Sequence, residues 1–176
     1  MILEKDIMRK IEKLHELFAL AIHYDFSEAL SIVIDSEIAF VDQTTLGELI
    51  ASLKNPSISY TFDVEGLAEP AIIAYSNPVS HALIDKALGK KPEGAFTQEQ
   101  LGVKTSEPIL KLDPKNAELE TNPEYLLDDI ARNSTVLLVA LEINGPDFKG
   151  LLEVSYFNTS IQPLTPILEA WEAPVQ

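Results

Sequence analysis

Few side chains in this sequence could carry out covalent or metal chemistry. The chain has no cysteine, which excludes disulfides, thiolate metal sites and cysteine nucleophiles. Its histidines are His15, His23 and His81, and none forms the His-x-x-x-His spacing that places two imidazoles on one metal ion. We therefore expect no metal site, and we expect these histidines to lie at exposed or flanking positions.

The sequence also lacks the common motifs of cofactor binding and nucleophilic catalysis. It contains no G-x-G-x-x-G, no G-x-x-x-x-G-K-[ST] and no G-x-S-x-G. Acidic residues are abundant, but pairs of carboxylates arise by chance among 28 of them. We expect no cofactor and no catalytic residue, and catalysis is the less favoured class of function.

The composition narrows the class of protein further. A length of 176 residues with 46% hydrophobic residues predicts one folded domain, residues 1–176, and excludes a disordered acidic tail. The net charge of −15 argues against nucleic acid as a partner, because phosphate binding needs a cationic surface. Residues 136–141 form the longest apolar run, so we expect no membrane span and a cytoplasmic location.

Charge is distributed unevenly along the chain. Residues 14–85 hold eleven acids and one basic residue, and residues 116–176 hold ten acids and two basic residues. Residues 86–115 instead carry a net charge of +2. Such a zone is either the solvating charge of a loop or a contact surface for an acidic partner, which it would attract electrostatically.

The first half, about residues 5–89, is expected to begin with an amphipathic helix. Its apolar stripe is predicted to comprise Ile7, Ile11, Leu14, Phe18, Ile22, Phe26 and Ala29. Thr45 and Glu48 form a capping box, and Ile58, Tyr60, Phe62 and Val64 alternate as in a half-buried strand. The further elements are predicted as a strand at 31–41, a short helix at 45–53, strands at 57–64 and 71–75, and a helix at 77–89.

The second half, about residues 96–171, repeats this order of elements. We predict a strand at 108–121, a short helix at 122–130, strands at 134–143 and 148–157, and a closing helix at 158–171. Two such halves sharing a mixed, mostly antiparallel sheet give a three-layer α/β/α domain with a pseudo-twofold repeat. The second copy of the first helix is reduced to residues 96–102.

Several runs of sequence resemble the middle domain of the flagellar motor switch protein FliM family. They are LHELFA at 14–19, DQTTLGELIASLKNPS at 42–57, ALIDKALG at 82–89, Phe96-Thr97 with Glu99, ETNP at 120–123 and SYF at 155–157. Their order along the chain is that of the family. The resemblance implies a fold of the CheC-like superfamily and a protein-binding role in flagellar rotation switching and chemotaxis, peripheral to the base of the flagellum.

The resemblance also implies a partner-binding site. In the family, the loop after the helix at 82–88 contacts the switch protein FliG through a Gly-Gly-x-Gly pattern. The corresponding residues here are Gly89, Lys90, Lys91, Pro92 and Gly94, in which a lysine replaces the second glycine. We expect these residues to bind FliG or another chemotaxis or flagellar component. Alternatively, Gly89 ends the helix and residues 92–94 form a turn.

The same superfamily offers an enzymatic alternative, the CheC/CheX type of phosphatase that acts on phosphorylated CheY. That chemistry uses a helix-borne Glu-x-x-Asn, and no asparagine in this sequence has a glutamate three residues before it. The nearest match, Asp113 to Asn116, has a proline within it, which argues against a helix. The phosphatase is therefore disfavoured.

Residues 96–122 are about twenty fewer than the family resemblance implies, so the helix expected beside the first helix is shortened. Its loss would expose apolar side chains over an area larger than monomers usually leave bare. We expect a partner to cover this area, and a second copy of the chain, forming a homodimer, is one such partner.

Overall fold

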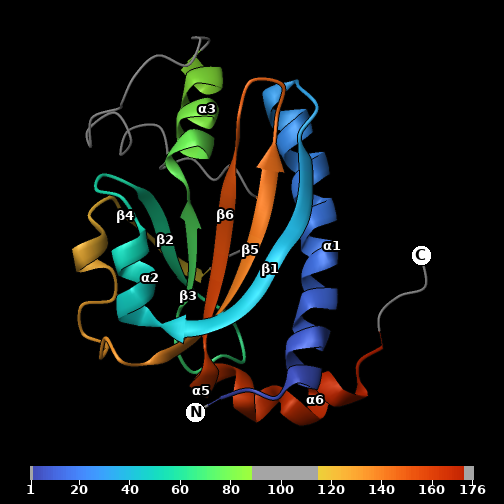
Figure 1. Ribbon diagram of the computed structural model, residues 1–176, viewed down its shortest axis with the longest axis vertical. Coiled ribbons are helices and arrows are strands. Elements are labelled where there is room, and N and C mark those ends of the chain that lie inside the picture. Colours follow the sequence, from blue (N-terminus) through green and yellow to red (C-terminus); the bar gives the residue numbers. More distant parts are fainter. Residues whose placement is uncertain (1, 89–114, 173–176) are drawn as a thin grey trace.

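The computed structural model describes residues 2–88 and 115–172 (Figure 1). The first half comprises α1 (Lys5–Leu30), β1 (Asp35–Thr45), α2 (Leu46–Ser52), β2 (Ile58–Asp63), β3 (Ala71–Tyr75) and α3 (Asn77–Leu88). The second half comprises β4 (Lys115–Glu120), the 3-10 helix η1 (Pro123–Tyr125), β5 (Thr135–Asn144), β6 (Lys149–Phe157), α5 (Asn158–Ile161), η2 (Gln162–Leu164) and α6 (Thr165–Ala170). The predicted helix at 96–102 and the first part of the strand at 108–121 lie outside the described residues.

The strand order of the sheet reflects the predicted repeat. The six strands are arranged β1-β5-β6-β3-β2-β4, so β1, β2 and β3 of the first half take positions symmetric to β4, β5 and β6 of the second. The centre of symmetry is the pairing of β3 with β6. Every pairing among the described strands is antiparallel, so the parallel pairing that a mixed sheet would contain does not occur there.

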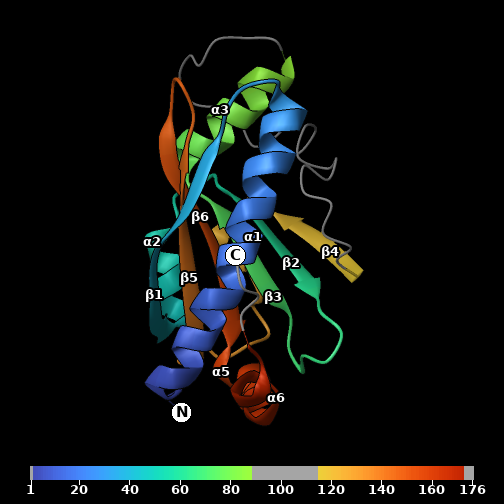
Figure 2. The ribbon, with the colours of Figure 1, turned by 90° about the vertical axis from the view of Figure 1, so that its right-hand side faces the viewer.

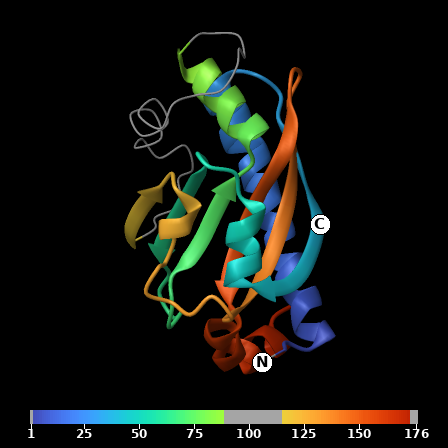
Figure 3. The same cartoon turned by 60° about the vertical axis from the view of Figure 1, so that its left-hand side comes forward.

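Helices cover both faces of this sheet, which confirms the three-layer α/β/α prediction. Figure 3 shows α2 on the near face and α1 behind the sheet, and Figure 2 shows α1 from its own side with α6 at its foot. The larger core lies between α1, α3 and the sheet. A smaller core on the other face joins α2 and the segment after η1 to the sheet through Leu46, Leu49, Leu126, Val136 and Phe157.

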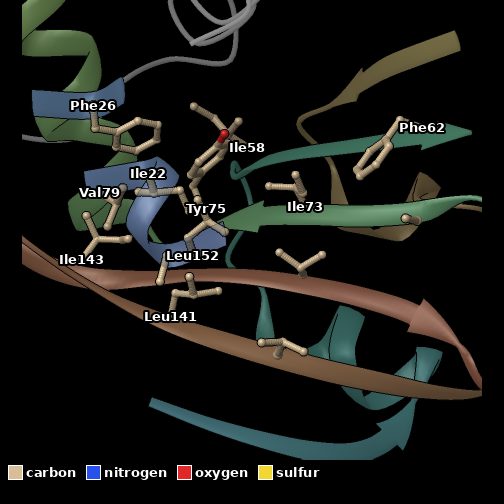
Figure 4. Packing of buried hydrophobic residues seen from close by; sticks show 14 of the residues in the cluster. Ile22, Phe26, Ile58, Phe62, Ile73, Tyr75, Val79, Leu141, Ile143 and Leu152 are labelled. Carbon is tan, nitrogen blue, oxygen red and sulfur yellow. The ribbon is translucent and has the colours of Figure 1, made fainter. Parts of the chain in front are cut away.

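The larger core is built on one stripe of α1. Figure 4 shows Ile22 and Phe26 of α1 directed toward Tyr75 and Leu152 of the sheet. The buried positions of the helix are Ile7, Ile11, His15, Ala19, Ile22, Phe26 and Leu30. The predicted stripe was therefore wrong at Leu14, which is 40% exposed, and at Ala29, which is also exposed. The expectation of an exposed or flanking position was wrong for His15, which is 4% exposed.

Four other sequence-based predictions differ from the structure. The short helix predicted at 122–130 is the three-residue 3-10 helix η1. The first strand lies at Asp35–Thr45 rather than 31–41, because Ser31 ends α1 with a left-handed backbone (φ of 54°) and residues 31–34 connect the helix to the strand. The strand β2 is buried on both faces, since Ser59 is 1% and Thr61 9% exposed, so it is not half-buried as predicted. The closing helix is interrupted at its prolines into α5, η2 and α6, because proline removes a backbone donor and disfavours the helical interior.

The capping box at the start of α2 is confirmed in both of its hydrogen bonds. The Glu48 amide donates to Thr45 Oγ1 at 3.2 Å, and the Thr45 amide donates to Glu48 Oε2 at 3.2 Å. Among the helices described, none is long and apolar enough to cross a lipid bilayer.

Candidate functional site

The sequence-based site residues Gly89, Lys90, Lys91, Pro92 and Gly94 lie outside the described residues. The chain reaches these residues through β3 and α3, which the structure describes. α3 follows β3 at one end of the sheet and lies next to β6 (Figure 1). This end of the domain is therefore the candidate site for a protein partner, and its described part is α3 together with the β5–β6 hairpin.

The helix α3 is anchored by apolar side chains that enter the larger core. Val79, Leu83 and Ile84 are all 3% exposed or less. Figure 4 shows Val79 beside Ile22 and Phe26 of α1 and near Ile143 of β5. These contacts hold the direction of α3 relative to the sheet.

Backbone hydrogen bonds also hold the start of α3 on β6. The Ser76 amide donates to the Leu151 carbonyl oxygen at 2.9 Å, and the Leu151 amide donates to Ser76 Oγ at 2.9 Å. Gly150 permits this close approach, because a Cβ atom there would lie 2.4 Å from Ser76 Oγ and 2.6 Å from Val79 Cγ2. The β3–α3 connection is thus packed directly on the backbone of β6.

One polar pair lies on α3, one turn apart. Asp85 is 3% exposed, and it is the only carboxylate side chain that is buried in the described part of the chain. Its Oδ2 atom has no hydrogen-bond partner among the described residues, which is costly for a buried polar group. Burial lowers the pKa of His81, and the negative charge of Asp85 partly opposes this shift.

The β5–β6 hairpin beside α3 has a fixed turn. The Gly145 amide donates to the Phe148 carbonyl oxygen at 2.9 Å. At the base of the turn, Glu142 accepts hydrogen bonds from Asn144 Nδ2 at 2.9 Å and pairs with Lys149 Nζ at 3.1 Å. The hydrogen bond from Asn144 and then the one from Lys149 lower the pKa of Glu142. The negative charge of Glu142 is therefore paired with Lys149, and these contacts fix the conformation of the hairpin next to α3.

A second polar cluster joins the two halves on the α2 side of the sheet. Asn55 Nδ2 donates to Asn122 Oδ1 at 3.4 Å, so Asn55-Pro56 of the first half meets Asn122-Pro123 of the second half. Arg132 Nη1 donates to the Leu126 carbonyl oxygen at 2.7 Å, and Nη2 donates to that of Glu124 at 2.8 Å. These groups hydrogen bond to one another and to the backbone, which indicates a structural junction.

The sequence did not predict the contact between buried His15 and half-buried Tyr156. His15 Nδ1 lies 2.8 Å from the Ile11 carbonyl oxygen, and Nε2 lies 2.8 Å from Tyr156 Oη. Burial lowers the pKa of His15 and raises that of Tyr156. The imidazole is enclosed between α1 and the sheet, so its role is in packing rather than at a surface open to substrate.

The described residues do not assemble a catalytic centre of the kinds considered. Within residues 2–88 and 115–172, no group of three or more His, Asp or Glu side chains is placed to hold a metal ion. Asn116, the nearest match to the phosphatase motif, lies in β4 and donates from Nδ2 to Asp63 Oδ2 at 2.8 Å. It is therefore on a strand, whereas the motif needs a helix.

Comparison with known proteins identifies the family. A family model described as flagellar motor switch protein FliM matches residues 4–106, more than half of the chain. The chain belongs to the FliM family. FliM of Bacillus subtilis (strain 168) is 21% identical over 182 residues, which cover 93% of this chain and 54% of that protein. FliM of Treponema pallidum (strain Nichols) is 24% identical over 178 residues, which cover 91% of this chain and 52% of that protein.

Solved structures confirm the fold. The crystal structure of the FliM middle domain from H. pylori has a TM-score of 0.77 and 20% identity, covering 95% of this chain and 99% of that one. The crystal structure of a FliG–FliM complex from H. pylori gives a TM-score of 0.77 and 19% identity, covering 95% and 100%. At this identity the likeness shows the fold. The chain spans about half the length of the FliM relatives it matches, and this half has the fold of the middle domain.

Proposed function

We propose that this chain is a non-catalytic protein-binding module of the flagellar motor switch, and that it binds a FliG-like switch protein. The observation that carries this proposal is the family match over residues 4–106, which includes α3 and the segment that follows it. The H. pylori FliM, whose fold this chain shares, has been crystallised in complex with FliG. Action in rotation switching and chemotaxis at the base of the flagellum is part of the proposal.

The binding surface in this proposal is the end of α3 together with Gly89, Lys90, Lys91, Pro92 and Gly94. The two lysines belong to a segment of net positive charge in a chain of net charge −15. An isolated positive region in a negative chain favours encounter with an acidic surface. The anchoring of α3 on β6 and in the core supports a defined starting point for this contact.

Charge reversal with a matched control tests the proposed contact. Lys90→Glu combined with Lys91→Glu is expected to weaken binding of FliG from the same organism by about tenfold or more, measured by isothermal titration calorimetry. Lys5→Glu combined with Lys54→Glu makes the same change in net charge at exposed positions away from α3, and should leave the affinity nearly unchanged. Equal affinity of wild type and the Lys90/Lys91 variant would contradict this contact.

The absence of catalysis is tested separately with phosphorylated CheY. We expect the rate of phosphate loss from CheY to stay the same when the full chain is added in excess. A faster loss of phosphate would instead favour the CheC/CheX type of phosphatase. The strand position of Asn116 supports the non-catalytic alternative.

We also propose that the chain forms a homodimer through the outer face of α1, where apolar side chains are exposed. Leu14, Leu17 and Tyr24 lie on this face and are 40%, 38% and 63% exposed. Exposed apolar side chains grouped on one helix face are typical of a protein contact. Light scattering of the chain at tens of micromolar should give twice the monomer mass, and Leu17→Glu should reduce it. A monomer mass for wild type would contradict the homodimer.

A further inference from the structure

The first strand of the sheet leaves one of its edges open. β1 is an end member of the strand order, and among the described strands it pairs only with β5. Figure 1 shows β1 as the outer strand, with α1 running beside it. An open edge offers backbone N–H and C=O groups that can pair with a further strand.

A groove runs between this open strand and α1. Its volume is about 810 Å³, and it is formed by the middle and second half of α1 and by the first residues of β1. Its floor includes Ala19 and Ile38, and Leu20 at its side is 47% exposed. The groove therefore combines an open strand edge with apolar side chains, which are the two features that a bound strand uses.

The charged side chains of the groove are mainly acidic. Glu12, Glu16, Asp35 and Glu37 line it, and His23 is the only histidine, lysine or arginine among its lining residues. Lys13 pairs with Glu16 at 3.1 Å, and His23 Nδ1 lies 4.0 Å from Asp35. Glu12 and Glu37 form no ion pair with any residue in the described ranges. Their charges are available to a cationic ligand.

The register of β1 determines how an added strand would contact the groove. Ser36 and Ile38 pair with Ile143 and Leu141, which belong to the core on the α1 side of the sheet. Glu37 pairs with Glu142, so it lies on the other side. A partner strand with alternating side chains would therefore place one set toward α1 and the other beside Glu37.

Two features restrict the length of β1 that is open to pairing. The register with β5 shifts between Ile38 and Phe40, as in a β-bulge, and this bends the strand. Near the other end, the Gln43 side chain hydrogen bonds to the backbone of Leu3, at 2.8 Å from its amide and 3.2 Å from its carbonyl oxygen. The open stretch is thus the first four residues of β1, which are also those that line the groove.

We propose that this groove binds an extended, lysine- or arginine-rich segment of a partner protein, which pairs with the first four residues of β1 as an added strand. Backbone hydrogen bonds to β1 supply the pairing, and the basic side chains neutralise Glu12 and Glu37. A second copy of the chain is a poorer occupant, because pairing of two open stretches would bring the carboxylates of Asp35 and Glu37 of both copies close together. This surface is distinct from the proposed FliG contact at α3.

A synthetic peptide of about seven residues, with a pair of adjacent lysines at its centre and valines on either side, is the probe, because adjacent side chains of a strand point to opposite faces and so reach both Glu12 and Glu37. We expect it to shift the backbone amide resonances of residues 35–38 in the ¹⁵N-labelled full chain. A peptide with glutamate in place of lysine should cause no shift. A lysine peptide that is N-methylated at alternate residues keeps its charge but loses donors, so it should bind about tenfold more weakly. Equal binding of the methylated peptide would overturn pairing with β1.

Charge reversal of groove residues in the protein tests whether the lysine peptide binds in this groove. Glu12→Lys combined with Glu37→Lys should weaken binding of the lysine peptide by about tenfold. Glu28→Lys combined with Glu65→Lys makes the same charge change at exposed positions outside the groove, and should change binding by less than about twofold. An equal loss in both variants would overturn the proposal, as would a dimer whose β1 amides are protected from solvent exchange.

Discussion

His15 Nε2 lies 2.8 Å from the hydroxyl oxygen of Tyr156, and this contact joins α1 to β6 in the interior of the domain. The tautomer follows from the second nitrogen of the ring. Nδ1 lies 2.8 Å from the Ile11 carbonyl oxygen, which can only accept, so Nδ1 carries the proton and donates. Nε2 therefore accepts from Tyr156, and the neutral imidazole satisfies both of its neighbours.

This arrangement predicts that the domain loses stability in mild acid. Burial lowers the pKa of His15 below its usual 6.5, so the unfolded chain binds this proton more readily than the folded one. The contribution of His15 is therefore fully present above about pH 6.5 and falls as the pH decreases below it, by at most about 1.4 kcal/mol per pH unit. Urea unfolding between about pH 8 and pH 5.5 measures the change in free energy of unfolding.

The variant His15→Gln isolates this effect from other titrating groups. It retains a polar side chain but does not titrate, so the difference in stability between wild type and variant should shrink as the pH falls. The comparison is needed because burial raises the pKa of Glu153, which acts in the opposite direction. A difference that is constant over this pH range would contradict the assignment to His15.

Removal of the Tyr156 hydroxyl should also destabilise the domain. Tyr156→Phe leaves His15 Nε2 buried without a donor, and we expect a loss of about 1–2 kcal/mol in the free energy of unfolding. Tyr125→Phe removes the same group from a side chain that is 64% exposed, and should have little effect. Urea unfolding at about pH 7.5 distinguishes the two, and similar losses in both variants would show that the bond to His15 is not the cause.

His15 also shows why part of the core could not be predicted from sequence. Leu14 is the more apolar neighbour, and a local pattern therefore assigns it to the buried stripe. The choice between the two depends on Tyr156, which is 141 residues away and offers a donor only in the folded sheet. Similarly, Ser59 and Thr61 lie on the face opposite Ile58 and Phe62 and are buried, but the alternation of β2 itself does not show that this face is covered.

Features that depend on neighbouring residues were predicted well. The capping box of Thr45 and Glu48 and the order of strands along the chain follow from local chemistry. The candidate site at residues 89–94 could not be predicted from local chemistry. It was inferred from the resemblance to the FliM family. The groove beside β1 could not be predicted, because it needs α1 and β1 to be placed side by side.

The capping box provides a prediction for the start of α2. Thr45→Ala removes the acceptor of the Glu48 amide, and we expect a loss of about 1 kcal/mol in the free energy of unfolding. Thr45→Ser retains the hydroxyl and should recover most of this loss. The hydrogen bond from Thr44 and then the one from the Thr45 amide lower the pKa of Glu48. Thermal unfolding of the three proteins tests the ranking, and equal stability of the alanine and serine variants would contradict it.

The position of α3 depends on the absence of a side chain at Gly150. In Gly150→Ala the new methyl group would meet Ser76 Oγ and Val79 Cγ2 at 2.4 and 2.6 Å, so the start of α3 must move away from β6. We expect a loss of about 1–3 kcal/mol in stability, together with weaker FliG binding if the proposed contact follows α3. Val79→Ala removes one of the two clashing groups, and Gly150→Ala should therefore cost less in a Val79→Ala background. If its cost is the same in both backgrounds, contact with Val79 does not explain the loss of stability.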